Sequence, residues 1–143
     1  MTTVPPPGDP HGLLVTRAQV AQRNAYAPYS KFAVGAAVQM NGQVFTGANV
    51  ENASYGLGVC AERTAIFAAV NAGARRLEGV AVCTDASPPS SPCGACRQVL
   101  LEFAPDPTAV TVTAINPRGE RRSWTLAELI PDGFSARELP ETP

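Results

Sequence analysis

The 143-residue chain lacks two features that would each point to a class of large partner. It has no excess of basic residues, because 11 Lys and Arg stand against 12 Asp and Glu. A chain without a basic field binds long nucleic acids poorly, since phosphate contacts dominate that affinity. No run of apolar residues approaches the roughly 18 that are needed to cross a bilayer. We therefore expect neither a nucleic acid nor a membrane as partner.

A secretion signal is also missing from the first ten residues, MTTVPPPGDP, which have neither a charged start nor an apolar run. We therefore expect a cytoplasmic protein, in which thiols stay reduced. The four cysteines are then candidates for metal binding, catalysis or the core rather than for disulfides. Histidine is scarce as well: the only one, His11, lies beside the Pro-rich start. A metal site elsewhere must therefore be built from other ligands.

The composition predicts one globular domain. Hydrophobic residues make up 45% of the chain and charged residues 16%, and a chain of this length buries enough surface to fold without disulfides. We expect a flexible Pro-rich tail over residues 1–12, a single domain over 13–134 and a C-terminal tail over 135–143.

Hydrophobic periodicity and turn residues predict alternating helices and strands. The expected helices cover residues 13–25, 60–72, 94–103 and a short stretch from the capping-box sequence at 125–128; the expected strands cover 32–40, 43–50, 77–84, 109–115 and 121–123. Asn41-Gly42 predicts a hairpin between the first two strands. This order predicts a three-layer α/β/α sandwich with a mixed five-stranded sheet. Its strand–helix–strand units favour largely parallel pairing.

Three of the cysteines stand where helices are expected to begin. Cys60 opens one helix, and Cys93 and Cys96 share the first turn of the next. The positive end of a helix dipole lowers the pKa of a thiol and so prepares it for a metal. Three protein ligands with an open fourth position are typical of catalytic zinc. Glu62, close to Cys60, could then exchange a proton with water near the metal.

Two other interpretations use the same cysteines. A non-catalytic zinc module would close its site with a fourth ligand, for which Cys83 is the candidate. A thiol oxidoreductase could use the Cys93-x-x-Cys96 pair, but Cys60 and Glu62 would then have no role. Cys83 lies inside an apolar strand, which favours a place in the core.

Four segments carry a resemblance to a known family: YAPYSKF at 26–32, NVEN at 49–52, CAERT at 60–64 and SPCGACRQ at 91–98. Together they resemble the small homotetrameric zinc-dependent cytidine deaminases, and the similarity runs from about Tyr26 to Phe134. The pattern of a metal ligand, any residue, Glu and a later Pro-Cys-x-x-Cys is that of the zinc deaminases. The resemblance implies the cytidine deaminase fold and one zinc ion per chain.

The resemblance also implies roles for particular residues. Cys60, Cys93 and Cys96 would bind zinc, Glu62 would carry protons, and Arg63 would donate hydrogen bonds to the sulfurs. The substrate-binding residues would be Asn49 and Glu51 on the ribose, Phe32 stacked on the pyrimidine, the backbone amide of Ala61 on the base, and Tyr55 and Phe134. In a homotetramer, Phe134 would complete the site of a neighbouring subunit, and Tyr55 could also reach across.

The implied reaction is the hydrolytic deamination of cytidine and 2′-deoxycytidine to uridine and 2′-deoxyuridine, as in pyrimidine salvage. A free nucleoside suits a chain that has no basic groove, because no base has to be flipped out of a duplex. A deaminase of another aminopyrimidine nucleoside, such as a nucleoside antibiotic, is the alternative within this class.

Overall fold

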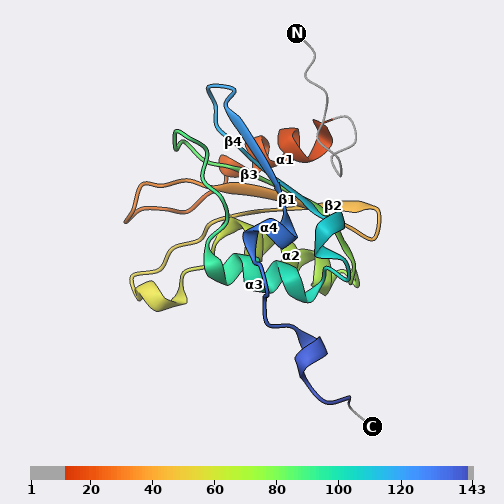
Figure 1. Ribbon diagram of the computed structural model, residues 1–143. Coiled ribbons are helices and arrows are strands. Elements are labelled where there is room, and N and C mark those ends of the chain that lie inside the picture. Colours follow the sequence, from red (N-terminus) through yellow and green to blue (C-terminus); the bar gives the residue numbers. More distant parts are fainter. Residues whose placement is uncertain (1–11, 142–143) are drawn as a thin grey trace.

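The computed structural model describes residues 12–141, so the expected N-terminal tail over 1–12 lies almost entirely outside the described part (Figure 1). The helices are α1 (Leu13–Gln22), α2 (Ala61–Asn71), α3 (Gly94–Glu102) and α4 (Leu126–Leu129), with short 3-10 turns η2 (Tyr55–Leu57), η3 (Pro107–Ala109) and η4 (Ala136–Glu138). The strands are β1 (Gly35–Met40), β2 (Gln43–Ala48), β3 (Leu77–Cys83), β4 (Thr111–Ile115) and β5 (Arg121–Thr125). The expected domain limits at 13 and 134 remain predictions.

The five strands form one mixed sheet in the order β2-β1-β3-β4-β5. Only β3 and β4 pair in parallel, whereas β1–β2, β1–β3 and β4–β5 are antiparallel. The mixed five-stranded sheet is thus confirmed, but the expectation of largely parallel pairing was wrong. β2 and β3, which α2 connects, do run the same way, but β1 lies between them and pairs with both.

Helices cover both faces of the sheet, which confirms the three-layer sandwich (Figure 1). The larger core lies between the sheet and α2, α3 and α4, where Ala36, Val38 and Met40 of β1 meet Ile66 and Leu100. A smaller core on the other face packs α1 against Ala37, Ala81, Cys83 and Ile115. The alternation of side chains along each strand separates these two sets.

Local sequence signals account for the elements that frame the site. Thr125 accepts a hydrogen bond from Glu128 N, and the Glu128 carboxylate accepts one from Thr125 N, so the predicted capping box starts α4. Gly47 lets α2 lie directly on β2, because a Cβ at this position would overlap the backbone nitrogen of Ala65. Among residues 12–141, no helix is long and apolar enough to span a membrane.

Candidate metal centre and active site

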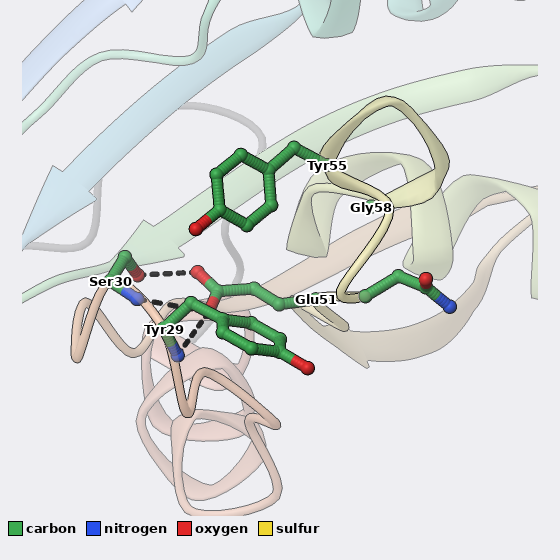
Figure 2. Close-up of a pocket in the computed structure, with 6 residues that line it drawn as sticks. Tyr29, Ser30, Glu51, Tyr55 and Gly58 are labelled. Carbon is green, nitrogen blue, oxygen red and sulfur yellow. Dashed lines mark hydrogen bonds between the residues drawn. The ribbon is translucent and has the colours of Figure 1, made fainter.

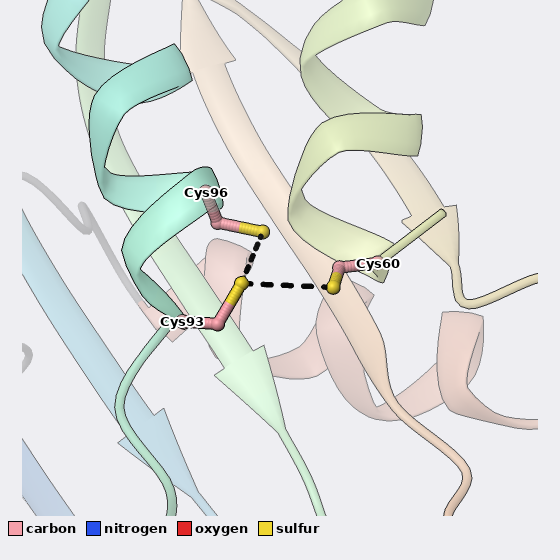
Figure 3. A group of neighbouring side chains, drawn as sticks. All are labelled: Cys60, Cys93 and Cys96. Carbon is pink, nitrogen blue, oxygen red and sulfur yellow. Dashed lines mark hydrogen bonds between the residues drawn. The ribbon is translucent and has the colours of Figure 1, made fainter. Parts of the chain in front are cut away.

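Two helix N-termini bring three cysteines together, as the sequence predicts (Figure 3). Cys60 is the N-cap of α2, Cys93 is the N-cap of α3, and Cys96 lies in the first turn of α3. The Cys93 sulfur lies 3.8 Å from that of Cys60 and 3.6 Å from that of Cys96. Sulfurs bound tetrahedrally to zinc at about 2.3 Å lie about 3.8 Å apart. All three sulfurs lie within 4.8 Å of one another, so they are close enough together to hold one zinc ion.

Cys83 does not belong to this group. Its side chain lies in the core on the α1 face of the sheet, opposite the layer formed by α2 and α3. The Cys83 thiol donates a hydrogen bond to Gln22 Oε1 at 3.2 Å, and burial raises its pKa to about 11. A closed four-sulfur site that includes Cys83 is thus incompatible with the fold.

The cysteine cluster favours negative charge on Cys60. Hydrogen bonding from the Cys96 thiol, followed by that from the Arg63 guanidinium, lowers the Cys60 pKa to about 5 despite partial burial. The pKa of Cys96 is raised, first because its proton is shared with Cys60 and then because it is buried. Arg63 Nη2 lies 3.4 Å from the Cys60 sulfur. A guanidinium in this place offsets the charge of a thiolate set.

Glu62 is the buried carboxyl group of the site. Only 4% of its surface is exposed, and the loss of water around the charged form raises its pKa. A carboxyl group whose pKa is raised toward the working pH can both accept and donate protons. Its position in the first turn of α2, two residues after Cys60, places it beside the sulfurs.

A cavity of about 250 Å³ opens beside the cysteines. It is lined by Ser30, Phe32, Val34, Asn49, Glu51, Cys60, Glu62, Val82, Thr84, Ser90, Ser91 and Cys93. Predicted residues from all four segments therefore meet in one cavity. Thr84, Ser90 and Ser91 were not predicted as site residues. Thr84 stood at the end of an expected strand, and a Ser- and Pro-rich stretch such as that around Ser90 and Ser91 is typical of any loop. The one available signal was that Ser90 and Ser91 directly precede the Pro-Cys-x-x-Cys motif.

Asn49 and Glu51 both fix backbone in the cavity wall. The Asn49 amide donates to Phe32 O at 2.8 Å and accepts from Val34 N at 2.9 Å. The Glu51 carboxylate accepts hydrogen bonds from the backbone nitrogens of Tyr29 and Ser30 at 3.0 and 3.1 Å, and from the Ser30 hydroxyl (Figure 2). The bond from the Ser30 hydroxyl is the first cause of the lowered pKa of Glu51. Glu51 therefore presents a charged acceptor.

The remaining predicted residues lie in different surroundings. Ala61 is buried at the start of α2. Tyr55 lies on η2 and is 80% exposed. Its ring centroid is 5.9 Å from that of Tyr29. Both tyrosines line a second cavity, of about 290 Å³, which is also lined by Glu51 (Figure 2). Phe134 is 59% exposed and does not line the cavity beside the cysteines, although its backbone oxygen accepts from Gln98 Nε2 at 2.8 Å. A single chain thus does not bring Phe134 to the site.

Known proteins similar to this chain share one description. Residues 10–113 match the family model of the cytidine and deoxycytidylate deaminase zinc-binding region. The cytidine deaminase of Halalkalibacterium halodurans is 47% identical over 128 residues, which cover 89% of this chain and 96% of that protein. That of Mycobacterium tuberculosis is 42% identical over 129 residues, covering 90% and 92%.

Solved structures agree in fold as well as in sequence. A crystal structure of cytidine deaminase from Burkholderia pseudomallei has a TM-score of 0.81 and 49% identity, covering 87% of this chain and 98% of that one. The structure of the Mycobacterium tuberculosis enzyme has a TM-score of 0.73 and 41% identity, covering 86% and 95%.

Proposed function

The chain belongs to the cytidine and deoxycytidylate deaminase family, and on that premise we propose that it deaminates free cytidine and 2′-deoxycytidine to uridine and 2′-deoxyuridine. One observation carries the proposal. The buried carboxyl group of Glu62 and the sulfurs of Cys60 and Cys93 line the same cavity, which has a volume of about 250 Å³. Ligand sites of small molecules commonly start at about this size.

Cys60, Cys93 and Cys96 would hold one zinc ion per chain. Their spacing and their all-sulfur donor set support this assignment. Zinc held there supplies a Lewis acid that makes water nucleophilic near neutral pH. Three thiolates on a divalent cation leave one negative charge, and the guanidinium of Arg63 offsets it through Cys60. The four cysteines form no disulfide, which is consistent with our assignment of the chain to the cytoplasm. The assignment to pyrimidine salvage follows from the proposed reaction.

Glu62 is assigned the proton transfers. It takes a proton from the attacking water and delivers it to N3 of the cytosine ring, which makes C4 a better electrophile. After the water oxygen has bonded to C4, Glu62 takes the remaining proton of that oxygen and hands it to the amino nitrogen. The C4–N bond then breaks, a C4 carbonyl forms, and ammonia leaves. Burial supports this role, because it raises the pKa of the carboxyl group and keeps competing water away.

The wall opposite the cysteines is assigned to the nucleoside. The charged carboxylate of Glu51 and the amide of Asn49 would bind the ribose hydroxyls, and Phe32 would stack on the pyrimidine. All three side chains line the cavity. The backbone amide of Ala61 would hold the base, which its place between Cys60 and Glu62 supports.

A homotetramer with shared sites would complete this cavity. Tyr55 and Phe134 are largely exposed in the single chain, and burial against a neighbouring subunit would let these aromatic rings exclude water from the substrate. Closed symmetry would then give four equivalent sites.

The proposed activity is tested by the loss of ultraviolet absorbance when cytidine is mixed with purified protein of measured zinc content. We expect turnover that stops after a chelator has removed the zinc and returns when zinc is added back. A zinc-loaded protein that leaves cytidine and 2′-deoxycytidine unchanged would refute the proposal.

A further inference from the structure

The β4–β5 hairpin makes hydrogen bonds to the first part of one loop. The loop covers residues 85–92, between β3 and α3, and runs beside the hairpin (Figure 1). Every second hairpin residue from 116 to 122 makes a contact with the loop. Three of them donate to backbone oxygens: Arg118 Nη2 to Asp85 O at 3.1 Å, Asn116 Nδ2 to Ala86 O at 3.0 Å and Arg122 Nη1 to Pro89 O at 3.4 Å. The fourth, Glu120, accepts a hydrogen bond at Oε1 from Ser87 Oγ at 2.7 Å. The hairpin thus holds four of the first five loop residues.

The hairpin turn is itself fixed. Asn116 is 1% exposed, and its Oδ1 accepts hydrogen bonds from the backbone nitrogens of Arg118 and Glu120 at 3.1 Å each. Its Nδ2 also donates to Glu120 Oε1 at 2.9 Å. Because a buried amide with all these partners has one arrangement, Glu120 presents its carboxylate to Ser87 in a defined place.

The other end of the loop forms part of the cavity. Ser90 and Ser91 line it, as does Cys93, which follows after Pro92. Arg97 holds this end by donating from Nε to Pro92 O at 2.7 Å and from Nη2 to Ser91 Oγ at 2.8 Å. The loop has no helix or strand of its own between residues 85 and 92. Its shape is therefore held by these side-chain bonds at its two ends and by the burial of Pro89 between them.

We propose that Asn116 and Glu120 are positioning residues for the substrate site, which they influence only by fixing the loop that carries Ser90 and Ser91. Neither Asn116 nor Glu120 lines the cavity. The inference rests on the proposed function, because it assigns the cavity to a nucleoside. Loss of loop order weakens the binding of the ground state and of the transition state alike, which raises KM and leaves kcat almost unchanged.

The test compares Glu120→Ala with Glu128→Ala. Glu128 is a matched control, because its exposed carboxylate also accepts a hydroxyl hydrogen bond, from Thr125 at 3.0 Å, but has no contact with the loop. We expect Glu120→Ala to raise the KM for cytidine roughly twofold to tenfold, the size of the one hydrogen bond that Glu120 makes to the loop. Ser87→Ala should do the same, and the double variant Ser87→Ala/Glu120→Ala should be no worse than either single change. Glu128→Ala should keep the parental KM.

Hydrogen–deuterium exchange gives a readout that does not depend on turnover. Peptides covering residues 85–91 should exchange faster in Glu120→Ala than in Glu128→Ala, with both proteins folded at the temperature used. Equal KM values and equal exchange in the two variants would overturn the positioning role. A parent chain that cannot deaminate cytidine would refute the proposed function instead, and the exchange comparison would still decide whether Glu120 fixes the loop.

Discussion

At the scale of the residue, the four cysteines differ in which face of the sheet they occupy. Cys60, Cys93 and Cys96 lie at helix N-termini on one side, and Cys83 lies in the core on the other. The sequence already separated them, because three stand at predicted helix starts and the fourth stands inside an apolar strand. Their different surroundings predict different chemistry.

The zinc content of single alanine variants of the four cysteines should depend on which face of the sheet the cysteine occupies. We expect Cys60→Ala, Cys93→Ala and Cys96→Ala to lose zinc, because two sulfurs hold the ion too weakly, whereas Cys83→Ala keeps one zinc per chain. Metal analysis of the purified variants checks this. A Cys83→Ala protein without zinc, beside a Cys60→Ala protein that retains it, would contradict the assignment.

A substitution of Glu62 tests proton transfer without removing a metal ligand. Glu62→Gln keeps the shape of the side chain but cannot accept a proton, so we expect normal zinc content and a fall in kcat of about 10²–10⁴-fold or more. Steady-state deamination with zinc measured in the same preparation is the experiment. Turnover within tenfold of the parent, with zinc intact, would assign the proton transfers to another group.

At the scale of the element, the wall of the cavity is built by side chains that bind backbone. Glu51 already bonds the Tyr29–Ser30 segment, so its effect on catalysis could come from that loop or from the sugar. Two substitutions separate these roles, because Ser30→Ala removes the hydroxyl bond and keeps the carboxylate.

We expect Glu51→Ala to lower kcat/KM for cytidine about five- to 150-fold, the cost of an unpaired buried hydroxyl, and to lower any action on free cytosine far less. Ser30→Ala should have a smaller effect on cytidine. The measurement is kcat/KM for nucleoside and free base in both variants. Equal losses for Glu51→Ala and Ser30→Ala on both substrates would mean that Glu51 only holds the loop.

Gly47 fixes the distance between α2 and β2. Gly47→Ala forces the helix away from the sheet, so we expect the free energy of unfolding to fall by about 1–3 kcal/mol, as in other overpacked sites. Gly56→Ala is the control, because a Cβ there meets no atom within 4 Å. Urea unfolding of both variants gives the comparison, and an unchanged midpoint for Gly47→Ala would show that the helix can move freely.

Much of the architecture followed from local signals. Asn41-Gly42 predicted the hairpin, and the Thr125–Glu128 capping box predicted α4, because both depend on a few adjacent residues. The direction of pairing did not follow, because nothing near β1 in the sequence says that it lies between β2 and β3. The cavity wall formed by Thr84, Ser90 and Ser91 was missed for the same reason, since only the tertiary fold gives these loop residues a role.

At the scale of the whole molecule, the expected contribution of Phe134 requires a second copy of the chain. Phe134 lies outside the cavity of its own chain and is 59% exposed. The resemblance could predict a shared site, but a single chain cannot contain one. Mixed assemblies can test it directly.

Glu62→Ala and Phe134→Ala chains, each weak alone, should regain activity when they are refolded together. Some sites of a mixed tetramer would then combine an intact Glu62 from one chain with an intact Phe134 from another. Turnover of the mixture is measured against the average of the two parents, after Phe134→Ala has been shown to remain tetrameric. Mixed tetramers that never exceed that average would rule out Phe134 as a residue shared between subunits.

Because Cys83 lies in the core on the far side of the sheet, the reactivity of its thiol reports whether the chain has unfolded. Cys83 is 1% exposed and its thiol has a pKa of about 11, so an alkylating reagent reaches it only when the core opens. Cys93, which is exposed, and Cys60, which is partly exposed, should instead become reactive as soon as a chelator takes the metal, whereas Cys96 is buried like Cys83. Counting alkylated cysteines by mass would therefore distinguish a protein that has lost its zinc, with labels on Cys60 and Cys93 only, from one that has lost its fold, with four labels.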